Sequence, residues 1–383
     1  MVPLSQGLSP EEVHRSALVL DTHADTPQRF VDEQWDFTAP LGPGMLSLET
    51  ARAGNLAGEL FALWVEPTQW QGRFAHRALS LLDGLLEQIR LHPNEMALCT
   101  SPDDVLAARA SGLFAAMISI EGGHAIEADL GLLRLFYRLG VRAMTLTWSN
   151  TNEWADSSGD INDETIPHHN GLTGFGRQVI AEMNRLGMIV DVSHVSDKTF
   201  WDVLEISQAP AIASHSSARS LTNSPRNLTD EMLVAIAKSN GVAMVNFYPA
   251  FIDEAYRQAW NAQRPERKLA HATLEVQYAG QPVPFAASTA IDKEFSARLG
   301  RAPFSSLIDH FMHMIQVAGV DHVGIGTDFD GIPEPPEGID SAADLPRITA
   351  ALMERGLSPE DLHKILGGNF LRVFRAVQAA ARP

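Results

Sequence analysis

Short runs of apolar residues, each followed by polar or glycine-containing loop residues, recur along the whole chain. Eight of these runs are apolar on both faces, as parallel strands covered by helices are; they span residues 17–21, 59–65, 114–120, 142–147, 187–193, 210–214, 242–247 and 322–327. A periodicity of 3.6 residues, typical of amphipathic helices, marks segments between them, including 74–91, 129–140 and 175–187. This repeated alternation predicts an α/β fold, the (β/α)8 TIM barrel, as a single domain over residues 1–383.

Two stretches depart from the alternation. The segment after the first strand contains WDFTAPLGPG and shows no clean helix before the second strand. The segment between strands seven and eight, from Pro249 to about Leu307, is a long insertion compared with a usual crossover. Because its stretch NAQRPERKLAHATLEVQYAGQPVPF is polar, we expect a surface excursion or lid near the functional site.

Charge and cysteine content narrow the class of protein. The formal net charge of −18 argues against a nucleic-acid partner, because phosphate binding requires a basic surface. The ends show no signal peptide or hydrophobic tail, and no stretch approaches the roughly 20 apolar residues that span a bilayer. We therefore expect a cytoplasmic protein without a membrane partner. Cys99 is the only cysteine, which excludes an internal disulfide and a thiolate metal cluster; we expect it to fill apolar space.

Five potential metal ligands follow the predicted strands: His23 and Asp25 in LVLDTHAD, Glu121 in MISIEGGH, His194 in IVDVSHVS and His215 in AIASHSS. The strands of a parallel barrel deliver their C-terminal residues to one face, so these side chains should meet. Imidazole nitrogens and carboxylate oxygens suit Zn²⁺ or a similar ion. The alternatives are a polar loop pair for the first two residues, a helix cap for Glu121, and buried structural histidines for the last two.

Further polar residues stand near the end of the chain. Asp328 follows the eighth strand in HVGIGTDFDG, where an acid can coordinate metal-bound water or move its proton. Asp330 in the same loop is expected to shape the turn. His310 and His313 have i, i+3 spacing on the preceding helix. Without a carboxylate partner nearby, we interpret them as core or exposed histidines.

Two histidines, a shared carboxylate and a His-x-Asp pair together predict a two-metal centre. Such a centre lowers the pKa of a bridging water, which yields hydroxide near neutral pH, and polarises a carbonyl for attack. The sequence contains no Gly-x-Ser-x-Gly, no His-Glu-x-x-His and no Walker loop, so the chemistries that depend on those motifs have no support.

Taken as a set, these blocks resemble the renal (membrane) dipeptidase family of the amidohydrolase superfamily. The resemblance runs from about Leu20 to about Phe370 through DTHAD, EGGH, NEWADS, DVSHVS, ASHSSARS, SPRN, MVNFY and GTDFDG, in the family's order. It implies a zinc-dependent barrel that hydrolyses dipeptides by attack of a metal-bridging hydroxide and tolerates a D-residue at the C-terminal position. It also suggests a homodimer.

The resemblance extends to individual positions. The ligand assignment that it implies is one zinc on His23 and Asp25, a second zinc on His194 and His215, and Glu121 bridging the two. Asp328 would be the acid/base that passes a proton to the leaving amine. Arg226, in NSPRN, would grip the C-terminal carboxylate of the substrate, a task that suits its planar fork. A plain surface arginine is the alternative.

One block departs from the family. Its mammalian members place a histidine after strand four, where it contacts the scissile carbonyl oxygen; here the block reads LTWSNTNEWADSS, and Trp148 stands at the matching position. Tryptophan offers one N–H donor and no positive charge. Either Trp148 Nε1 or the nearby His168 or His169 supplies the electrophile, or the substrate differs. The alternative for Trp148 is a plain pocket wall.

The main hypothesis is therefore a dipeptidase with two Zn²⁺ ions as cofactors and a small dipeptide as substrate. A metal-dependent lactonase or cyclic-amide hydrolase keeps the metals and changes the bond that is cleaved, as the tryptophan at position 148 suggests. A non-hydrolytic barrel that binds a peptide-like ligand is a hypothesis from another class. Metal content below one zinc per chain, together with no hydrolysis of any dipeptide, would distinguish it.

Overall fold

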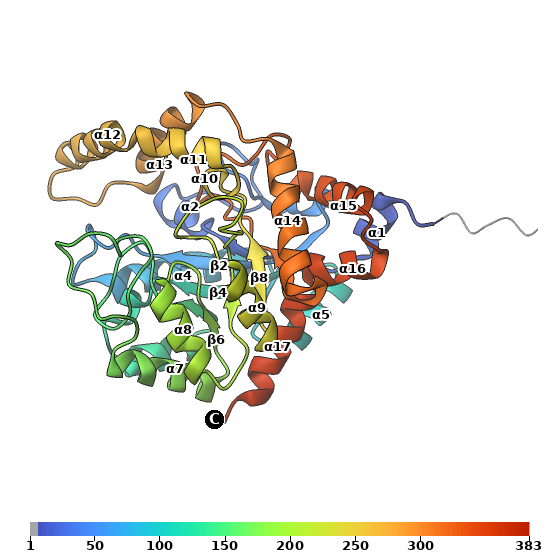
Figure 1. The fold of residues 1–383 in the computed structure, drawn as a ribbon, viewed down its shortest axis with the longest axis horizontal. Coiled ribbons are helices and arrows are strands. Elements are labelled where there is room, and N and C mark those ends of the chain that lie inside the picture. The colour runs from blue at the N-terminus through green and yellow to red at the C-terminus, as the bar shows by residue number, and fades with distance from the viewer. Residues whose placement is uncertain (1–6, 383) are drawn as a thin grey trace, which may run out of the picture.

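A ring of parallel strands forms the centre of the computed structural model, which describes residues 7–382 (Figure 1). Neighbouring strands follow the order β1-β2-β4-β5-β6-β7-β8-β9. Hydrogen bonds from Asp25 N to Phe329 O (2.9 Å) and from Asp328 N to His23 O (3.0 Å) join the end of β1 to the segment after β9 and close the ring. The strands are β1 Val19–Ala24, β2 Leu56–Trp64, β3 Met96–Leu98, β4 Phe114–Glu121, β5 Val141–Thr145, β6 Ile189–Asp191, β7 Ile212–Ala213, β8 Val242–Val245 and β9 Val323–Ile325. The predicted TIM barrel is confirmed.

Helices surround the ring, and several of them lie along its outer face in Figure 1. Their bounds are α1 Pro10–Ser16, α2 Pro27–Asp32, α3 Leu48–Ala53, α4 Phe74–Leu91, α5 Pro102–Ala110, α6 Leu130–Arg138, α7 Gly174–Leu186, α8 Asp197–Ile206, α9 Asp230–Lys238, α10 Pro249–Ile252, α11 Glu254–Ala262, α12 Arg264–Gln277, α13 Phe285–Ala297, α14 Phe304–Ala318, α15 Leu345–Glu354, α16 Pro359–His363 and α17 Asn369–Ala380. Because helices cover the outside of the barrel and side chains fill its inside, every residue of β4 is buried.

Local chemistry explains where the helices start and stop. The α7 helix begins after Thr173, whose hydroxyl accepts a hydrogen bond from Gly176 N at 3.2 Å. It ends at Leu186 and is followed by Gly187, whose φ of 78° lies in the left-handed region that glycine adopts readily. A threonine, Thr229, caps α9 in the same way. These ends set the length of each crossover and therefore the level at which the next strand begins.

Some local predictions are wrong or incomplete. The loop after β1, expected to lack a helix, contains α2 and α3, each six residues long and too short to show helical periodicity. A capping box between Ser47 and Thr50 starts α3. β3 is an additional strand that pairs with β4 off the ring. β1 spans Val19–Ala24 rather than residues 17–21, because pairing with β2 continues to Ala24.

The long insertion between β8 and β9 is helical. Its helices α11 and α13 pack through Tyr256, Trp260 and Phe295, which form a small apolar cluster separate from the barrel core. α12 buries none of its residues and projects to the upper left of Figure 1, beyond α11 and α13. Among the residues that the structure describes, no helix has the length and apolar character needed to cross a membrane.

Candidate metal centre

The five predicted ligands meet at the C-terminal ends of the strands. His23 lies on β1 and Glu121 ends β4, while Asp25, His194 and His215 follow β1, β6 and β7. All five are buried, with exposed fractions between 1 % and 7 %. The strands that carry them are far apart in sequence, and closure of the barrel is what brings them together.

Glu121 lies between the histidines and offers a different oxygen to each side. Its Oε2 is 3.3 Å from His23 Nε2, and its Oε1 is 3.0 Å from His194 Nε2 and 3.6 Å from His215 Nε2. Asp25 Oδ2 is 3.7 Å from His23 Nε2. The carboxylate therefore divides the site into two halves, as a ligand shared between two cations would. The alternative of a helix cap is wrong, because the helical turn after Glu121 has no side-chain cap.

The nitrogen and oxygen atoms of the site are placed as metal ligands would be, and they do not satisfy one another by hydrogen bonding. His194 Nε2 and His215 Nε2 are 2.9 Å apart, a contact that two neutral lone pairs tolerate only with a proton or a cation between them. His23 Nε2 and Asp25 Oδ1 are buried and lack a hydrogen-bond partner. Two groups can each surround an ion with ligand atoms within 4.8 Å of one another: His23, Glu121 and His215, and His23, Asp25 and Asp328.

The pKa values of the site residues are also consistent with a bound metal ion. Burial, reinforced by the charge of Glu121, raises the pKa of Asp25 to about 7, and burial raises the pKa of Asp328 to about 6. Burial lowers the pKa of His194 to about 4 and that of His215 well below the usual value. Neutral imidazole is the form of histidine that binds metal. The charges of Glu121 and Asp25 raise the pKa of His23 well above its usual value despite its burial. The carboxyl groups need positive charge beside them in order to ionise together, and a cation bound in place of the His23 proton would supply it.

Backbone strain is concentrated at two of these residues. His194 has a φ of 67° and Asp328 a φ of 63°, in the left-handed region that residues other than glycine rarely adopt. Ser158 N donates to the carbonyl of His194 at 2.8 Å, and Asp328 N donates to the carbonyl of His23 at 3.0 Å. The surrounding hydrogen bonds thus hold strained peptides in place, a combination that is common at functional sites.

A buried acid behind the histidines was not predicted. Asp191 ends β6 and accepts hydrogen bonds from Ser193 N (3.0 Å), Ser214 N (2.9 Å) and Ser214 Oγ (2.6 Å), and from the hydroxyl of Thr145. Ser214 Oγ in turn lies 2.7 Å from His215 Nδ1. The signal in the sequence was an aspartate at the end of the apolar run IVD, a position where an unpaired charge would be costly.

Arg226 lies in the loop after β7, and Asp328 lies in the loop after β9. Asn246 Nδ2 donates to Asp328 Oδ2 at 2.9 Å. Arg226 is buried, so the alternative of a surface arginine is wrong; it donates to the carbonyl of His215 at 3.1 Å and to Ser216 Oγ at 3.3 Å. Its Nε is buried without a partner. Arg226 therefore retains a donor for a ligand group, and it is not itself among the residues that line the main cavity.

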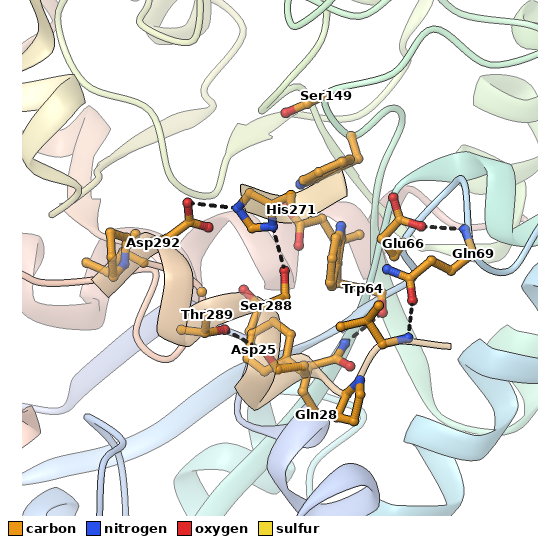
Figure 2. A pocket seen from close by; sticks show the side chains of 18 of the residues that line it. Asp25, Gln28, Trp64, Glu66, Gln69, Ser149, His271, Ser288, Thr289 and Asp292 are labelled. Atoms are coloured by element: carbon orange, nitrogen blue, oxygen red, sulfur yellow. Dashed lines mark hydrogen bonds and ion pairs between the residues drawn. The ribbon is translucent and has the colours of Figure 1, made fainter. Parts of the chain in front are cut away.

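A cavity of about 810 Å³ lies over the centre, and four side chains of the centre line it: Asp25, Glu121, His194 and Asp328. Its far wall comes from the insertion, which confirms the expectation of a polar excursion near the site. Figure 2 shows His271 of α12 in this wall, with its ring facing Asp292 at 3.2 Å and Ser288 at 3.5 Å, both on α13. Trp148 is another wall residue; its ring centroid is 6.3 Å from that of His194.

The four other histidines that the sequence singled out lie outside the centre. His169 Nε2 contacts the carbonyl of Asn152 at 2.8 Å, and His168 Nδ1 lies 3.8 Å from Asp156. Neither lines the cavity, so the hypothesis that one of them replaces the family's histidine is not supported by their position. The other two are His310, buried against Ala218 N, and His313, paired with Asp230.

Asp330, which was expected to shape its own turn, directs its side chain to another loop. It accepts hydrogen bonds from Thr26 Oγ1 and Met45 N, both at 2.7 Å. These contacts tie the loop after β9 to the loop after β1. Asp330 therefore supports the rim next to Asp25 and Asp328 without facing the histidines itself.

Comparison with known proteins agrees with this geometry. The family model described as "Membrane dipeptidase (Peptidase family M19)" matches residues 9–383. Dipeptidase tcpJ of Claviceps purpurea is 32% identical over 359 residues, which cover 92% of this chain and 73% of that protein. The crystal structure of the probable dipeptidase PvdM from Pseudomonas aeruginosa superposes with a TM-score of 0.82 at 28% identity, over 97% of this chain and 98% of that one.

A metallopeptidase from Rhodobacter sphaeroides, solved with a phosphinate mimic of the dipeptide L-Ala-D-Ala, superposes with a TM-score of 0.74 at 26% identity, over 94% of this chain and 99% of that one. The family model spans nearly the whole length, and buried carboxylate and imidazole groups that could hold a metal ion stand together at the barrel rim. The chain belongs to the membrane dipeptidase family, peptidase family M19, and is a metal-dependent dipeptidase.

Proposed function

We propose that this dipeptidase uses two zinc ions, one held by His23 and Asp25 and the other by His194 and His215, with Glu121 shared. The main support for the proposal is that the two carboxylate oxygens of Glu121 face different halves of the site. Oε2 is 3.3 Å from His23 Nε2, and Oε1 is 3.0 Å from His194 Nε2. When bound, zinc ions lower the pKa of a water between them and polarise the scissile carbonyl. Nitrogen and oxygen ligands without thiolate suit this metal.

Asp328 is the residue suited to move the proton. It lies within ligand distance of His23 and Asp25, and Asn246 orients it through the 2.9 Å hydrogen bond. Burial raises its pKa to about 6, which is close to the pH at which a proton must be both accepted and released. It would take the proton from the attacking water and give it to the leaving amine.

Arg226 is suited to bind the C-terminal carboxylate of the dipeptide. It is a buried cation whose Nε has no hydrogen-bond partner, and a carboxylate would add to its hydrogen bonding. The relative solved with a mimic of L-Ala-D-Ala supports a small peptide substrate and acceptance of a D-residue at this position.

The test combines metal analysis with a library of L-Xaa-L-Xaa and L-Xaa-D-Xaa dipeptides. The purified protein should contain two zinc ions per chain and hydrolyse members of both series. His194→Ala should lose metal and activity together, because it removes a ligand. Asp328→Asn should keep its zinc and lose about 10²- to 10⁴-fold in kcat, because it removes the proton carrier and leaves all five proposed zinc ligands in place.

His313→Ala is the matched control, since this histidine pairs with Asp230 away from the cavity. It should match the wild type in zinc content and turnover, and circular dichroism should show that all variants are folded. Turnover like the wild type in His194→Ala or Asp328→Asn would contradict the assignment of these residues. Hydrolysis of lactones or cyclic amides with no hydrolysis of dipeptides would contradict the substrate class.

A further inference from the structure

Three aromatic side chains form a continuous wall that starts at a metal ligand and ends on the insertion. Trp148 lies 6.3 Å from the His194 ring, Trp64 lies 5.0 Å from Trp148, and Phe285 lies 5.9 Å from Trp64, all measured between ring centroids. All three line the cavity and are only partly buried. Apolar surface thus remains uncovered inside the cavity, directly beside the reacting centre.

The backbone sets this wall at the level of the metal ligands. Trp64, the last residue of β2, is the register partner of Glu121 on β4, so the two side chains leave the sheet side by side. Trp148 follows β5, the strand on the other side of β4. The two tryptophans therefore meet in the part of the lining next to Glu121, and any group bound beside them is within reach of the scissile position.

Phe285 is held against the tryptophans by the insertion. Val283 N donates to Gln69 Oε1 at 2.6 Å, and Phe285 N donates to Asp32 Oδ2 at 3.3 Å. Asp32 is itself neutralised by a two-pronged pair with Arg77, at 2.8 Å and 2.9 Å. Asp32 and Arg77 together carry no net charge, so they leave the environment of the aromatic wall without an extra charge at this point.

The strand order places the wall opposite the carboxylate side. In a closed ring ordered β1-β2-β4-β5-β6-β7-β8-β9, β2 lies across from β7, and β4 lies across from β8. Arg226 is in the loop after β7, whereas Trp64 ends β2. A dipeptide with its carboxylate at Arg226 and its peptide bond over Glu121 would extend its amino-terminal residue toward the tryptophans.

We propose that Trp64, Trp148 and Phe285 form the subsite for the side chain of the substrate's amino-terminal residue, and that this subsite selects a large aromatic side chain. The inference rests on the proposed function, because it uses the orientation that Arg226 gives the substrate. The cavity supports it, since about 810 Å³ is within the range of roughly 300–1,000 Å³ that accommodates drug-sized ligands and far exceeds the needs of two small residues. The residue that replaces the family's histidine thus takes part in selectivity.

The experiment compares kcat/KM for L-Phe-Gly, L-Ala-Gly, L-Lys-Gly and Gly-L-Phe. The wild type should prefer Phe-Gly to Ala-Gly by about tenfold or more, because each aromatic contact contributes about 2- to 12-fold. Phe285→Ala should reduce this preference to about threefold or less, Phe285→Tyr should restore it, and the rate with Gly-Phe should respond no more than the rate with Ala-Gly. Leu269→Ala is the control on the same insertion, because this side chain is 70% exposed and outside the cavity lining.

The outcomes separate the two proposals. Hydrolysis of Ala-Gly without a preference for Phe-Gly, or with a preference for Lys-Gly that points to the Glu66 carboxylate in the lining, would overturn the aromatic subsite and leave the dipeptidase mechanism intact. Equal losses on Phe-Gly and Gly-Phe in Phe285→Ala would also overturn it, since they indicate a general effect of the insertion. No hydrolysis of any of the four peptides or of the wider library would overturn both proposals.

Discussion

Asp191→Asn tests whether a residue that has no direct contact with a proposed metal ligand nevertheless controls the tautomer of that ligand, His215. A carboxylate can only accept hydrogen bonds, so the hydroxyl of Ser214 must donate its proton to Asp191 at 2.6 Å. The Ser214 oxygen then accepts from His215 Nδ1, 2.7 Å away, which leaves the lone pair of His215 on Nε2. Nε2 is the atom that faces Glu121, at 3.6 Å. The relay therefore sets the tautomer that a metal requires.

Asparagine reverses this relay. If its carbonyl keeps the two backbone N–H donors, its amide NH₂ faces the hydroxyls of Ser214 and Thr145 and donates to them. The Ser214 proton then turns toward His215 Nδ1, and the proton of the ring moves to Nε2. Two hydrogen bonds to a charged acceptor are lost, each contributing about 1.5–3 kcal/mol, so the free energy of unfolding should fall by about 3 kcal/mol. Zinc affinity should fall by about 10- to 100-fold, as for other outer partners of ligating histidines.

The assay is zinc affinity by competition with a chromophoric chelator, together with urea unfolding of the metal-free protein. Asp197→Asn is the matched control, because its carboxylate forms a partly exposed ion pair with Arg219 on the surface; such pairs contribute about 0–1 kcal/mol. Ser214→Ala should weaken zinc binding as Asp191→Asn does, since it interrupts the same relay. Zinc affinity in Asp191→Asn within twofold of the wild type would refute the tautomer argument.

Three further predictions follow from single features. Removal of zinc by chelation should lower the free energy of unfolding measured in urea by about 2.7 kcal/mol for each site that is filled at a free zinc concentration of 100 times its Kd, and Glu121→Gln should show a smaller difference, because it weakens the shared ligand. Burial lowers the pKa of His310 to about 4, below the value near 6.5 of the unfolded chain. The stability that neutral His310 contributes is therefore present above pH 6.5 and is lost as the pH falls toward 4. This loss amounts to about 3 kcal/mol; His310→Gln should flatten the urea stability curve over that range, and an unchanged slope would refute it. Cys99 is buried and its pKa is raised to about 12, so a thiol reagent at pH 8 should react with it only at the rate of unfolding; fast labelling of the native protein would contradict this.

The sequence was sufficient for the barrel and for the ligands for one physical reason. Parallel strands buried on both faces appear as continuous apolar runs, and the residues after them necessarily lie on one face. His23, Glu121, His194 and His215 each stand at such a place, so their meeting follows from the fold class alone. Short elements lacked this signal: the six residues of α3 depend on a cap at Ser47, not on periodicity.

Local patterns in the sequence could not predict contacts between distant segments of the chain. The sequence placed His168 and His169 near the site, but the loop directs them to Asp156 and Asn152 instead. Asp191 looked like one more residue of a strand, and its role appears only when Ser214 from the next strand lies beside it. In each case the orientation of a side chain depends on a partner from another segment.

The sequence by itself determined the fold class, the chemical type of the ligands and the strands that carry them, because burial and strand-end position are local properties of the chain. Only the tertiary structure decided how Glu121 divides its oxygens between two halves of the site, how Ser214 connects Asp191 to His215, and that Phe285 completes a wall with Trp64. These features depend on closure of the barrel and on docking of the insertion, which bring together residues that no local pattern relates.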